Sequence, residues 1–431
     1  MARKVIVNVV RIITAALFIF SGFVKAVDPL GTQYKIKDYL TALGLDWLAS
    51  DMITLPASML ISAFEFSLGV FLLFALRRKL ITRVILVFMS VMTIVTLWIA
   101  VADPISDCGC FGDAIVIGNT ETFLKNIVLT AFVILLCRHY ADMIPFVRRS
   151  AQWVVINYTV IFVFVVSGYS LYFLPQFDFR PYYVGADIKK GMEIPEDAEQ
   201  PEFETTFIME KNGERKEFSL DNYPDSTWTF VDSKTVITKK GYEPPIHDFS
   251  LTLRDSGEDI TYEILEDSNY VFLVISPYIE KADDSNFGEI DRIYEYAIEH
   301  GYSFYGVTSS GDDAIERWRD ITGAEYKFCT ADAITLKTIV RSNPGLVLLK
   351  DGIVIGKWSH NSLPMFDTTD ESMVKTLAES MEQKSVARKV FEMLLWFFLP
   401  LILLTFADRF YNIHGWLKKI FGRTNKTTIE K

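Results

Sequence analysis

The sequence predicts a helical membrane bundle joined to an α/β domain outside the bilayer. Half of the 431 residues are hydrophobic and the mean hydropathy is +0.22, which is more apolar than a soluble protein of this length. Six apolar runs are long enough, or nearly so, to cross a bilayer. From about residue 246, strand-like and helix-like segments alternate and end in a hairpin and a helix, a pattern typical of an α/β domain.

The six predicted spans lie at about 5–25, 55–76, 80–101, 122–137, 153–174 and 390–406. The fourth and sixth are close to the short limit for a transmembrane helix. The first also resembles a signal peptide, because Val24-Lys25-Ala26 loosely matches a cleavage site. We favour a retained span, because the run is long and Arg11 and Lys25 lie at its ends.

Basic residues precede the first span and cluster in every second connection, which the positive-inside rule places in the cytoplasm. This predicts a multi-pass protein of the bacterial inner membrane with both termini cytoplasmic and residues 176–386 periplasmic. The residues concerned are Arg3, Lys4, Arg77, Arg78, Lys79, Arg83, Arg138, Arg148, Arg149, Arg409, Lys418, Lys419, Arg423 and Lys426.

The chain is expected to divide into five parts: a four-helix membrane module (1–150), a fifth transmembrane helix (151–175), an acidic strand-rich segment (176–245), an α/β domain (246–386), and a sixth helix with a basic tail (387–431). The net charge of -11 is concentrated in the outer segment, where an acidic run indicates a solvated linker. Such a surface disfavours nucleic acid. The expected partners are the lipid bilayer and periplasmic or envelope proteins.

Short strands are predicted in the acidic segment, with Asn212-Gly213 as a hairpin turn. They are Thr205–Met209, Lys216–Leu220 and Thr227–Val231. The α/β domain is predicted to contain the strands Tyr270–Ser276, Ser303–Thr308, Tyr326–Cys329, Leu346–Leu349 and Ile353–Trp358, and helices at 286–300, 312–320, 331–340 and 369–382.

Cys108-Gly109-Cys110 lies in a short polar loop between two apolar runs. The glycine eases the tight bend that brings the cysteines together. A disulfide in so small a ring is expected to be strained and easily reduced, as exchanging disulfides are. A redox pair is the favoured interpretation; two reduced or separately packed cysteines, and a pair of metal ligands, are the alternatives. A metal site is disfavoured because no nearby histidine or third cysteine completes a tetrahedral set of ligands.

Three further candidates lie in or beside the predicted spans. Glu65, near the middle of the second span, is expected to face the bundle interior and find a partner. It could relay protons, hydrogen-bond a quinone, or serve as a structural hydrogen bond between helices. Lys25 and Asp28, at the outer end of the first span, could join that relay or mark the membrane interface.

Acidic residues surround the cysteine pair, and Asp113 among them is a further candidate for the proton relay or for a structural role. Asp113, with Asp103 and Asp107, is expected to raise the pKa of the thiols unless Lys25 or Lys125 offsets the negative charge.

The other two cysteines are less favoured as redox residues. Cys137 lies at the inner end of the fourth span as an apolar residue. Cys329, alone in the outer segment, is a buried thiol or a partner in exchange.

The first 140 residues or so resemble the DoxX/MauE superfamily of four-helix membrane proteins. The shared features are the stretch Ser21-Gly-Phe-Val-Lys-Ala-Val-Asp-Pro29, Glu65 with Gly69, and Asp107-Cys-Gly-Cys-Phe-Gly-Asp113. MauE-like proteins are associated with thiol–disulfide maturation of envelope proteins, and DoxX-like proteins include subunits of sulfur-compound:quinone oxidoreductases. The resemblance therefore implies a redox-associated membrane protein.

The segment from Pro244-Pro245-Ile-His-Asp-Phe-Ser onwards resembles thioredoxin-like domains of the TlpA and peroxiredoxin type, and Pro344 matches the position of the family's cis-proline. Where the family carries Cys-x-x-Cys, this chain reads Pro277-Tyr-Ile-Glu-Lys-Ala-Asp-Asp284. Thioredoxin-type thiol chemistry cannot run there, because the thiolate is the nucleophile. The resemblance implies a docking or substrate-holding domain, or one that positions the Cys-Gly-Cys loop.

The favoured function is thiol–disulfide exchange or electron transfer through Cys108 and Cys110. No cofactor is required by the sequence, and a membrane quinone is a candidate electron acceptor. The alternative is a non-enzymatic envelope scaffold or maturation factor whose thioredoxin-like domain binds partner proteins. A transporter is less favoured, because intramembrane charges are few and repeated halves are not evident.

Overall fold

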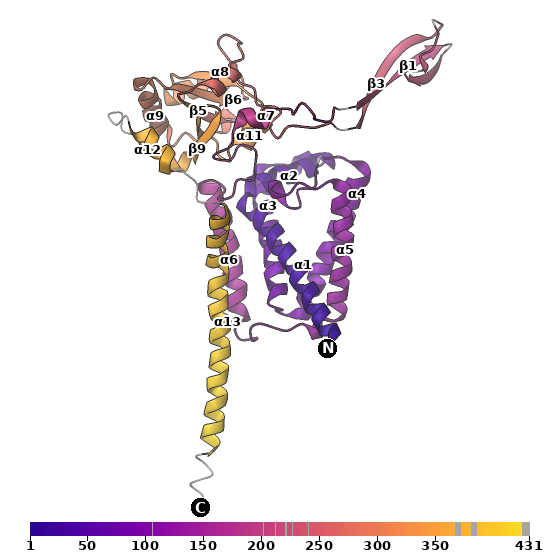
Figure 1. Ribbon diagram of the computed structural model, residues 1–431, viewed down its shortest axis with the longest axis vertical. Helices are drawn as coiled ribbons and strands as arrows, with labels where there is room; N and C mark the ends of the chain where they lie inside the picture. The colour runs from indigo at the N-terminus through magenta and orange to yellow at the C-terminus, as the bar shows by residue number, and fades with distance from the viewer. Residues whose placement is uncertain are drawn as a thin grey trace, which may run out of the picture.

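The computed structural model describes residues 1–105, 107–200, 202–211, 213–219, 222–225, 227–239, 241–366, 372–380 and 386–424. It has a helical bundle with an α/β domain above one end (Figure 1). α1 begins, and α13 ends, on the side of the bundle opposite that domain (Figure 1).

Each of the six predicted spans is a helix long and apolar enough to cross a membrane. The fourth and sixth are longer than predicted, because polar residues extend the helices beyond the apolar runs. The helices are α1 (Ala2–Val27), α3 (Asp51–Leu73), α4 (Arg78–Ala102), α5 (Asn119–Arg138), α6 (Gln152–Tyr172) and α13 (Val386–Thr424), the last with its apolar part at Val386–Asp408.

α1 and α3 pack at backbone contact through glycines. A Cβ added to Gly22 would clash with the backbone N of Phe66, and one added to Gly69 would lie 2.7 Å from the backbone N of Ile19. Without a strong hydrophobic driving force inside the bilayer, such close packing is a main source of helix association. The contact brings Lys25 of α1 level with Glu65 of α3.

Gly22→Ala is therefore expected to destabilise the bundle by about 1–3 kcal/mol, because the new methyl group meets rigid backbone. Gly168→Ala in α6 is the matched control, since an added Cβ there meets nothing within 4 Å. Thermal unfolding in detergent should separate the two variants, and equal midpoints would contradict the packing described.

The connection at 26–54, expected only as an outer loop, contains the helix α2 (Pro29–Ala42) and the 3-10 turn η1 (Asp46–Leu48). Asp28 caps α2, because its Oδ1 accepts a hydrogen bond from the N–H of Gly31 at 2.9 Å. Pro29 follows at the first helical position, where its missing N–H costs nothing. α2 lies across the end of the bundle beneath the α/β domain (Figure 1).

The α/β domain is built on one six-stranded sheet in the order β4-β7-β6-β5-β8-β9. β5, β6 and β7 are parallel, whereas β8 pairs antiparallel with both β5 and β9. This parallel core ending in an antiparallel hairpin is the thioredoxin-like topology that the sequence predicts. The strands are β4 (Thr252–Leu253), β5 (Tyr270–Ser276), β6 (Ser303–Thr308), β7 (Lys327–Thr330), β8 (Gly345–Lys350) and β9 (Ile353–Ser359).

Apolar cores cover both faces of this sheet, because successive side chains of a strand point to opposite sides. Along β5, Val271, Leu273 and Ile275 join one core and Phe272 and Val274 join the other. The helices are α7 (Ile188–Met192), α8 (Thr261–Glu266), α9 (Phe287–Glu299), α10 (Asp312–Thr322), α11 (Ala333–Ile339) and α12 (Met373–Ser380), with η5 (Ile279–Lys281) after β5. Residues 369–371 and 381–382 of the predicted 369–382 helix lie outside the described residues.

A separate three-stranded antiparallel sheet, of order β2-β1-β3, projects sideways from the domain (Figure 1). Its strands are β1 (Glu202–Lys211), β2 (Glu214–Ser219) and β3 (Thr229–Lys239). β1 and β2 pair from Lys211 opposite Glu214, as a two-residue hairpin loop requires. Asn212 of the predicted turn and Leu220 lie outside the described residues.

Part of the segment 176–245 packs into the α/β domain. Tyr182 and Ile188 are buried in the core on one face of the sheet. Lys357 of β9, which is buried, forms an ion pair with Asp178 and donates to the carbonyl of Tyr182 at 3.0 Å. These contacts fix the chain that leaves α6 against the domain.

Candidate functional site

The two cysteines of the Cys-Gly-Cys loop lie side by side as free thiols. Their Sγ atoms are 2.8 Å apart. Gly109 adopts φ +61°, a left-handed conformation that glycine takes without a Cβ penalty. The N–H of Gly109 donates to Oδ1 of Asp107 at 2.9 Å. The loop is thus held in a bend that brings the two sulfur atoms together.

Hydrogen bonds from two helices hold this loop. The Tyr39 hydroxyl of α2 donates to the carbonyl of Cys108 at 2.7 Å, and the Ser21 hydroxyl of α1 donates to the carbonyl of Cys110 at 2.6 Å. Because α1 and α2 are rigid elements, the loop is positioned by the bundle.

Hydrogen bonds favour a thiolate at Cys108. The pKa of the Cys108 thiol is lowered to about 6, chiefly because the Cys110 thiol donates a hydrogen bond to it, with Lys125 contributing. Asp107 is paired with Lys35 at 2.7 Å, so its charge is partly neutralised. The expected rise in thiol pKa is therefore not seen at Cys108. The pKa of Cys110 is raised, chiefly by its hydrogen bond to Cys108 and by burial.

A cavity of about 210 Å³ adjoins the pair. Its walls come from the Cys-Gly-Cys loop, from α2, from the membrane helices α1, α3 and α4, and from the chain that follows α6. These lining residues include Lys35, Ile36 and Tyr39 of α2, Ile61 of α3, Met92, Val95 and Thr96 of α4, and Phe177, Phe179 and Arg180. The cysteines thus face a largely apolar space that extends between membrane helices.

Lys25 and Glu65 form an ion pair beside the cysteines. Nζ of Lys25 lies 2.5 Å from Oε2 of Glu65, and the two side chains are 13% and 9% exposed. Nζ of Lys25 also donates to the Ser21 hydroxyl at 3.1 Å. A second cavity, of about 50 Å³, is lined by Lys25, Glu65 and Cys110. The structure brings these sequence-predicted residues together.

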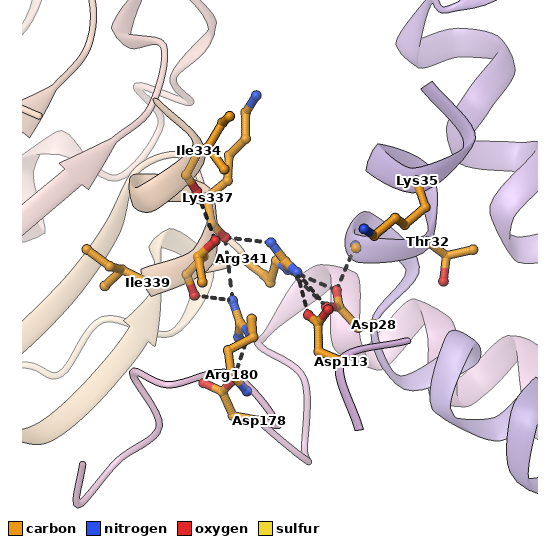
Figure 2. Close-up of polar contacts among 12 residues, drawn as sticks. Asp28, Thr32, Lys35, Asp113, Asp178, Arg180, Ile334, Lys337, Ile339 and Arg341 are labelled. Atoms are coloured by element: carbon orange, nitrogen blue, oxygen red, sulfur yellow. Dashed lines mark hydrogen bonds and ion pairs between the residues drawn. The ribbon is translucent and has the colours of Figure 1, made fainter. Parts of the chain in front are cut away.

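Asp28 and Asp113 are instead bound by an arginine of the α/β domain (Figure 2). Arg341 lies 2.9 Å from Asp28 and 3.2 Å from Asp113, with its side chain 6% exposed. Although burial opposes ionisation, the Arg341 guanidinium lowers the pKa of the Asp28 carboxyl. Burial raises the pKa of Asp113. Both carboxyls therefore serve the contact between the two parts of the chain.

Further basic side chains of the domain meet α2 and α3. Lys337 of α11 lies 5.2 Å from the ring centre of Tyr34 in α2. Lys281 lies 4.0 Å from Asp51 at the start of α3. The contact between domain and bundle is therefore basic on one side and acidic on the other.

The position expected for Cys-x-x-Cys is occupied by Tyr278 and η5. The carbonyl of Tyr278 accepts a hydrogen bond from the Asn343 side chain at 2.9 Å, and the bond between Asn343 and Pro344 is cis. Cys329 is fully buried in β7, and burial raises the pKa of its thiol to about 12. This burial leaves Cys329 unsuited to exchange.

Two other features bear on the alternatives raised by the sequence. The Sγ of Cys137 lies 3.1 Å from the carbonyl of Thr82, away from the pair. Among the residues that the structure describes, no group of three or more His, Cys, Asp or Glu side chains could hold a metal ion.

Sequence reasoning missed the residues that α2 and the α/β domain bring to the site. Asp28-Pro29 is a helix-start signal, which could have revealed α2 with Lys35 and Tyr39 on it. The position of Arg341 just before the predicted cis-proline could have marked it as a residue of that loop. Its partner Asp28 is 313 positions away, and no local pattern indicates such a contact.

Comparison with known proteins gives two family matches. Residues 3–138 match the family described as "Methylamine utilisation protein MauE", and residues 203–240 match a "Domain of unknown function (DUF8463)". No curated protein matches the chain. The DoxX part of the resemblance stays a prediction.

Among solved structures, the chain is similar to one described as "Solution structure of a putative protein disulfide isomerase from Bacteroides thetaiotaomicron". The identity is 15% and the TM-score 0.22, over 31% of this chain and 83% of that one. A likeness this weak carries no argument about function. The chain combines a MauE-like membrane module at residues 3–138 with a domain of thioredoxin-like topology that has no Cys-x-x-Cys.

Proposed function

We propose that Cys108 and Cys110 form a dithiol–disulfide centre that takes electrons from thiols of envelope proteins and passes them to a membrane quinone. The observation that carries the proposal is the separation of 2.8 Å between the two sulfur atoms, beside a cavity lined by residues of α3 and α4. In this proposal a protein thiol approaches the pair from the outer side of the membrane, and a lipid-soluble oxidant approaches it through the cavity.

The proposed chemistry balances in two half-reactions. A substrate thiolate attacks the Cys108–Cys110 disulfide, a second substrate thiol resolves the mixed disulfide, and the substrate leaves oxidised. The reduced pair then gives two electrons and two protons to the quinone, which becomes quinol as the disulfide reforms. The low pKa of Cys108 makes it the better leaving group in the first step.

Residues around the cavity suit a quinone head group. The apolar walls, which include Ile61 and Met92, favour a flat apolar ring, and Lys35 and Arg180 supply hydrogen-bond donors for its oxygen atoms. Lys25 and Glu65 could provide and accept the protons, or they could hold α1 and α3 together.

The proposed orientation places the Cys-Gly-Cys loop and the α/β domain in the periplasm of a bacterial inner membrane, with both termini cytoplasmic. The support is the positive-inside pattern of the connections. A pair on this side meets the oxidising compartment, where disulfides persist.

A direct test uses the reduced protein in lipid nanodiscs with a short-chain benzoquinone. We expect one quinol formed and two thiols lost per protein, both at Cys108 and Cys110. Cys137→Ser is the control, since its sulfur lies apart from the pair and should leave the stoichiometry unchanged. Quinone reduction without thiol loss, or no reaction, would refute the quinone step.

The pH dependence of alkylation checks the thiolate. Because the pKa of Cys108 is about 6, the thiolate is present above that value and is lost as the pH falls through it. In a Cys137→Ser/Cys329→Ala background, the iodoacetamide rate should be nearly flat between pH 7 and 9 and fall below about 6. An ordinary thiol would gain rate throughout this range, as the pH rises through its pKa of about 8.5, and that outcome would show an unactivated pair.

A scaffold or maturation factor is the second candidate. The absence of cysteine at Pro277–Glu280 favours it, because the domain retains the fold without its thiol chemistry. Under this reading, deleting residues 176–386 abolishes partner recovery while Cys108→Ser/Cys110→Ser does not. Partners that are recovered equally well after the deletion would exclude it.

A further inference from the structure

The loops of the α/β domain that face the membrane module lie at the carboxyl end of the parallel strand β5 and just before β8. They carry η5 with Lys281, and the segment from Lys337 to Pro344. In open α/β sheets, this edge is where ligands bind. Here the edge is covered by the chain's own α2, through Tyr34 and Asp28.

Arg341 is the centre of that contact. Its Nε lies 2.9 Å from Oδ2 of Asp28 and its Nη2 lies 3.2 Å from Asp113. Its Nη1 donates to the carbonyl of Lys337 at 2.6 Å, so the guanidinium is held by its own domain while it binds the bundle (Figure 2). A buried, fully partnered arginine of this kind is costly to separate from its carboxylates.

The same acidic residues border the cysteine cavity. Asp28 and Asp113 line it together with Cys108 and Cys110, and Asp113 follows Cys110 by three positions. Removing Arg341 would therefore leave two unpaired carboxylates in the cavity wall.

The chain segment after α6 that lines the cavity is also hydrogen-bonded to the domain. Arg180, which lines the cavity with Phe177 and Phe179, donates to the carbonyl of Thr338 at the end of α11 at 2.9 Å. It also donates to Asp178 at 2.7 Å. A domain that moves off the bundle would draw this stretch of chain with it.

We propose that the face of the membrane module formed by Asp28, Tyr34, Asp51 and Asp113 is a docking surface for the chain's own α/β domain, and that the docked domain restricts access of thiols and proteins to Cys108 and Cys110. Charge complementarity selects the occupant, since Lys281, Lys337 and Arg341 meet this acidic face. The proposal concerns access to the two cysteines, and it can be tested independently of the redox chemistry.

The test measures access to the cysteines in the reduced full-length protein, in nanodiscs and in the Cys137→Ser/Cys329→Ala background. A polyethylene-glycol maleimide, too bulky for the closed cavity, should label Arg341→Glu at least about 10-fold faster than the parent, the change given by a loss of about 1.4 kcal/mol of docking free energy. Arg317→Glu, an exposed arginine of α10, is the matched control and should label at the parent rate.

A second measurement reports docking itself. A benzophenone amino acid in place of Tyr34 should crosslink to residues 337–341 in the parent, and Arg341→Glu should abolish that crosslink. Loss of the crosslink with no gain in labelling would refute the restriction of access. A crosslink that survives would refute the role of Arg341. If Arg341→Glu does not accumulate in cells, Lys337→Glu is tested in its place. The same labelling and crosslinking results would then support or refute the proposal.

Discussion

Cys108→Ser and Cys110→Ser are each expected to lower the rate of dithiol oxidation by at least about 1,000-fold, to the background level. Either change removes one of the two sulfur atoms that lie 2.8 Å apart, and a disulfide cannot form with one sulfur. The measurement is the initial rate of quinol formation by reduced protein in nanodiscs.

The single variants also separate the two cysteines. If Cys108 is the leaving group, the substrate is held on Cys110. In Cys108→Ser, the Cys110 thiolate can attack the disulfide of an oxidised substrate protein and release the substrate's other thiol, which leaves a mixed disulfide that Cys108 cannot resolve. Cys110→Ser should trap less. Cys137→Ser should keep the parent rate. Activity that survives in Cys108→Ser/Cys110→Ser would rule out this pair as the redox centre.

Lys25→Met is expected to destabilise the membrane bundle by about 3 kcal/mol, because it leaves Glu65 buried without its partner. Lys25→Met/Glu65→Met should recover most of that loss, because an apolar pair of similar volume is often as stable as a buried ion pair. Thermal or denaturant unfolding of the single and double variants completes a double-mutant cycle.

The redox rate of the same double variant distinguishes the two roles left open for the ion pair. Lys25 lines both cavities with Cys110. If the pair moves protons to the site, the stable double variant oxidises its thiols at least about 10-fold more slowly, the effect of losing a modest acid–base contribution. A double variant as stable and as fast as the parent would assign Lys25 and Glu65 to helix packing alone.

Hydropathy predicted the six membrane helices because the spans are long apolar runs, and the bilayer admits few alternatives to a helix. The strands of the α/β core were also predicted from the sequence. The continuous apolar strand Tyr270–Ser276 lies in the sheet over the range expected from the sequence. The edges of elements were less certain, as with β7, which begins one residue later than expected.

The candidate site was predictable only in part. Cys108 and Cys110 stand out because their chemistry is local to three residues. The ion pair between Lys25 and Glu65 depends on how α1 and α3 pack, and the contact between Arg341 and Asp28 spans 313 positions. Sequence spacing does not encode contacts of that range, so the docking of the domain on the module emerges only from the folded chain.

The most direct test of the redox centre is the state of Cys108 and Cys110 in intact cells. Thiols would be trapped by acid and labelled with a mass-tagging alkylator before and after mild reduction, in the Cys137→Ser/Cys329→Ala background. We expect two tags to appear only after reduction, from an intramolecular disulfide, together with a fraction in mixed disulfides with envelope proteins. Two thiols that are fully labelled before reduction, with no mixed disulfide, would contradict a dithiol–disulfide centre.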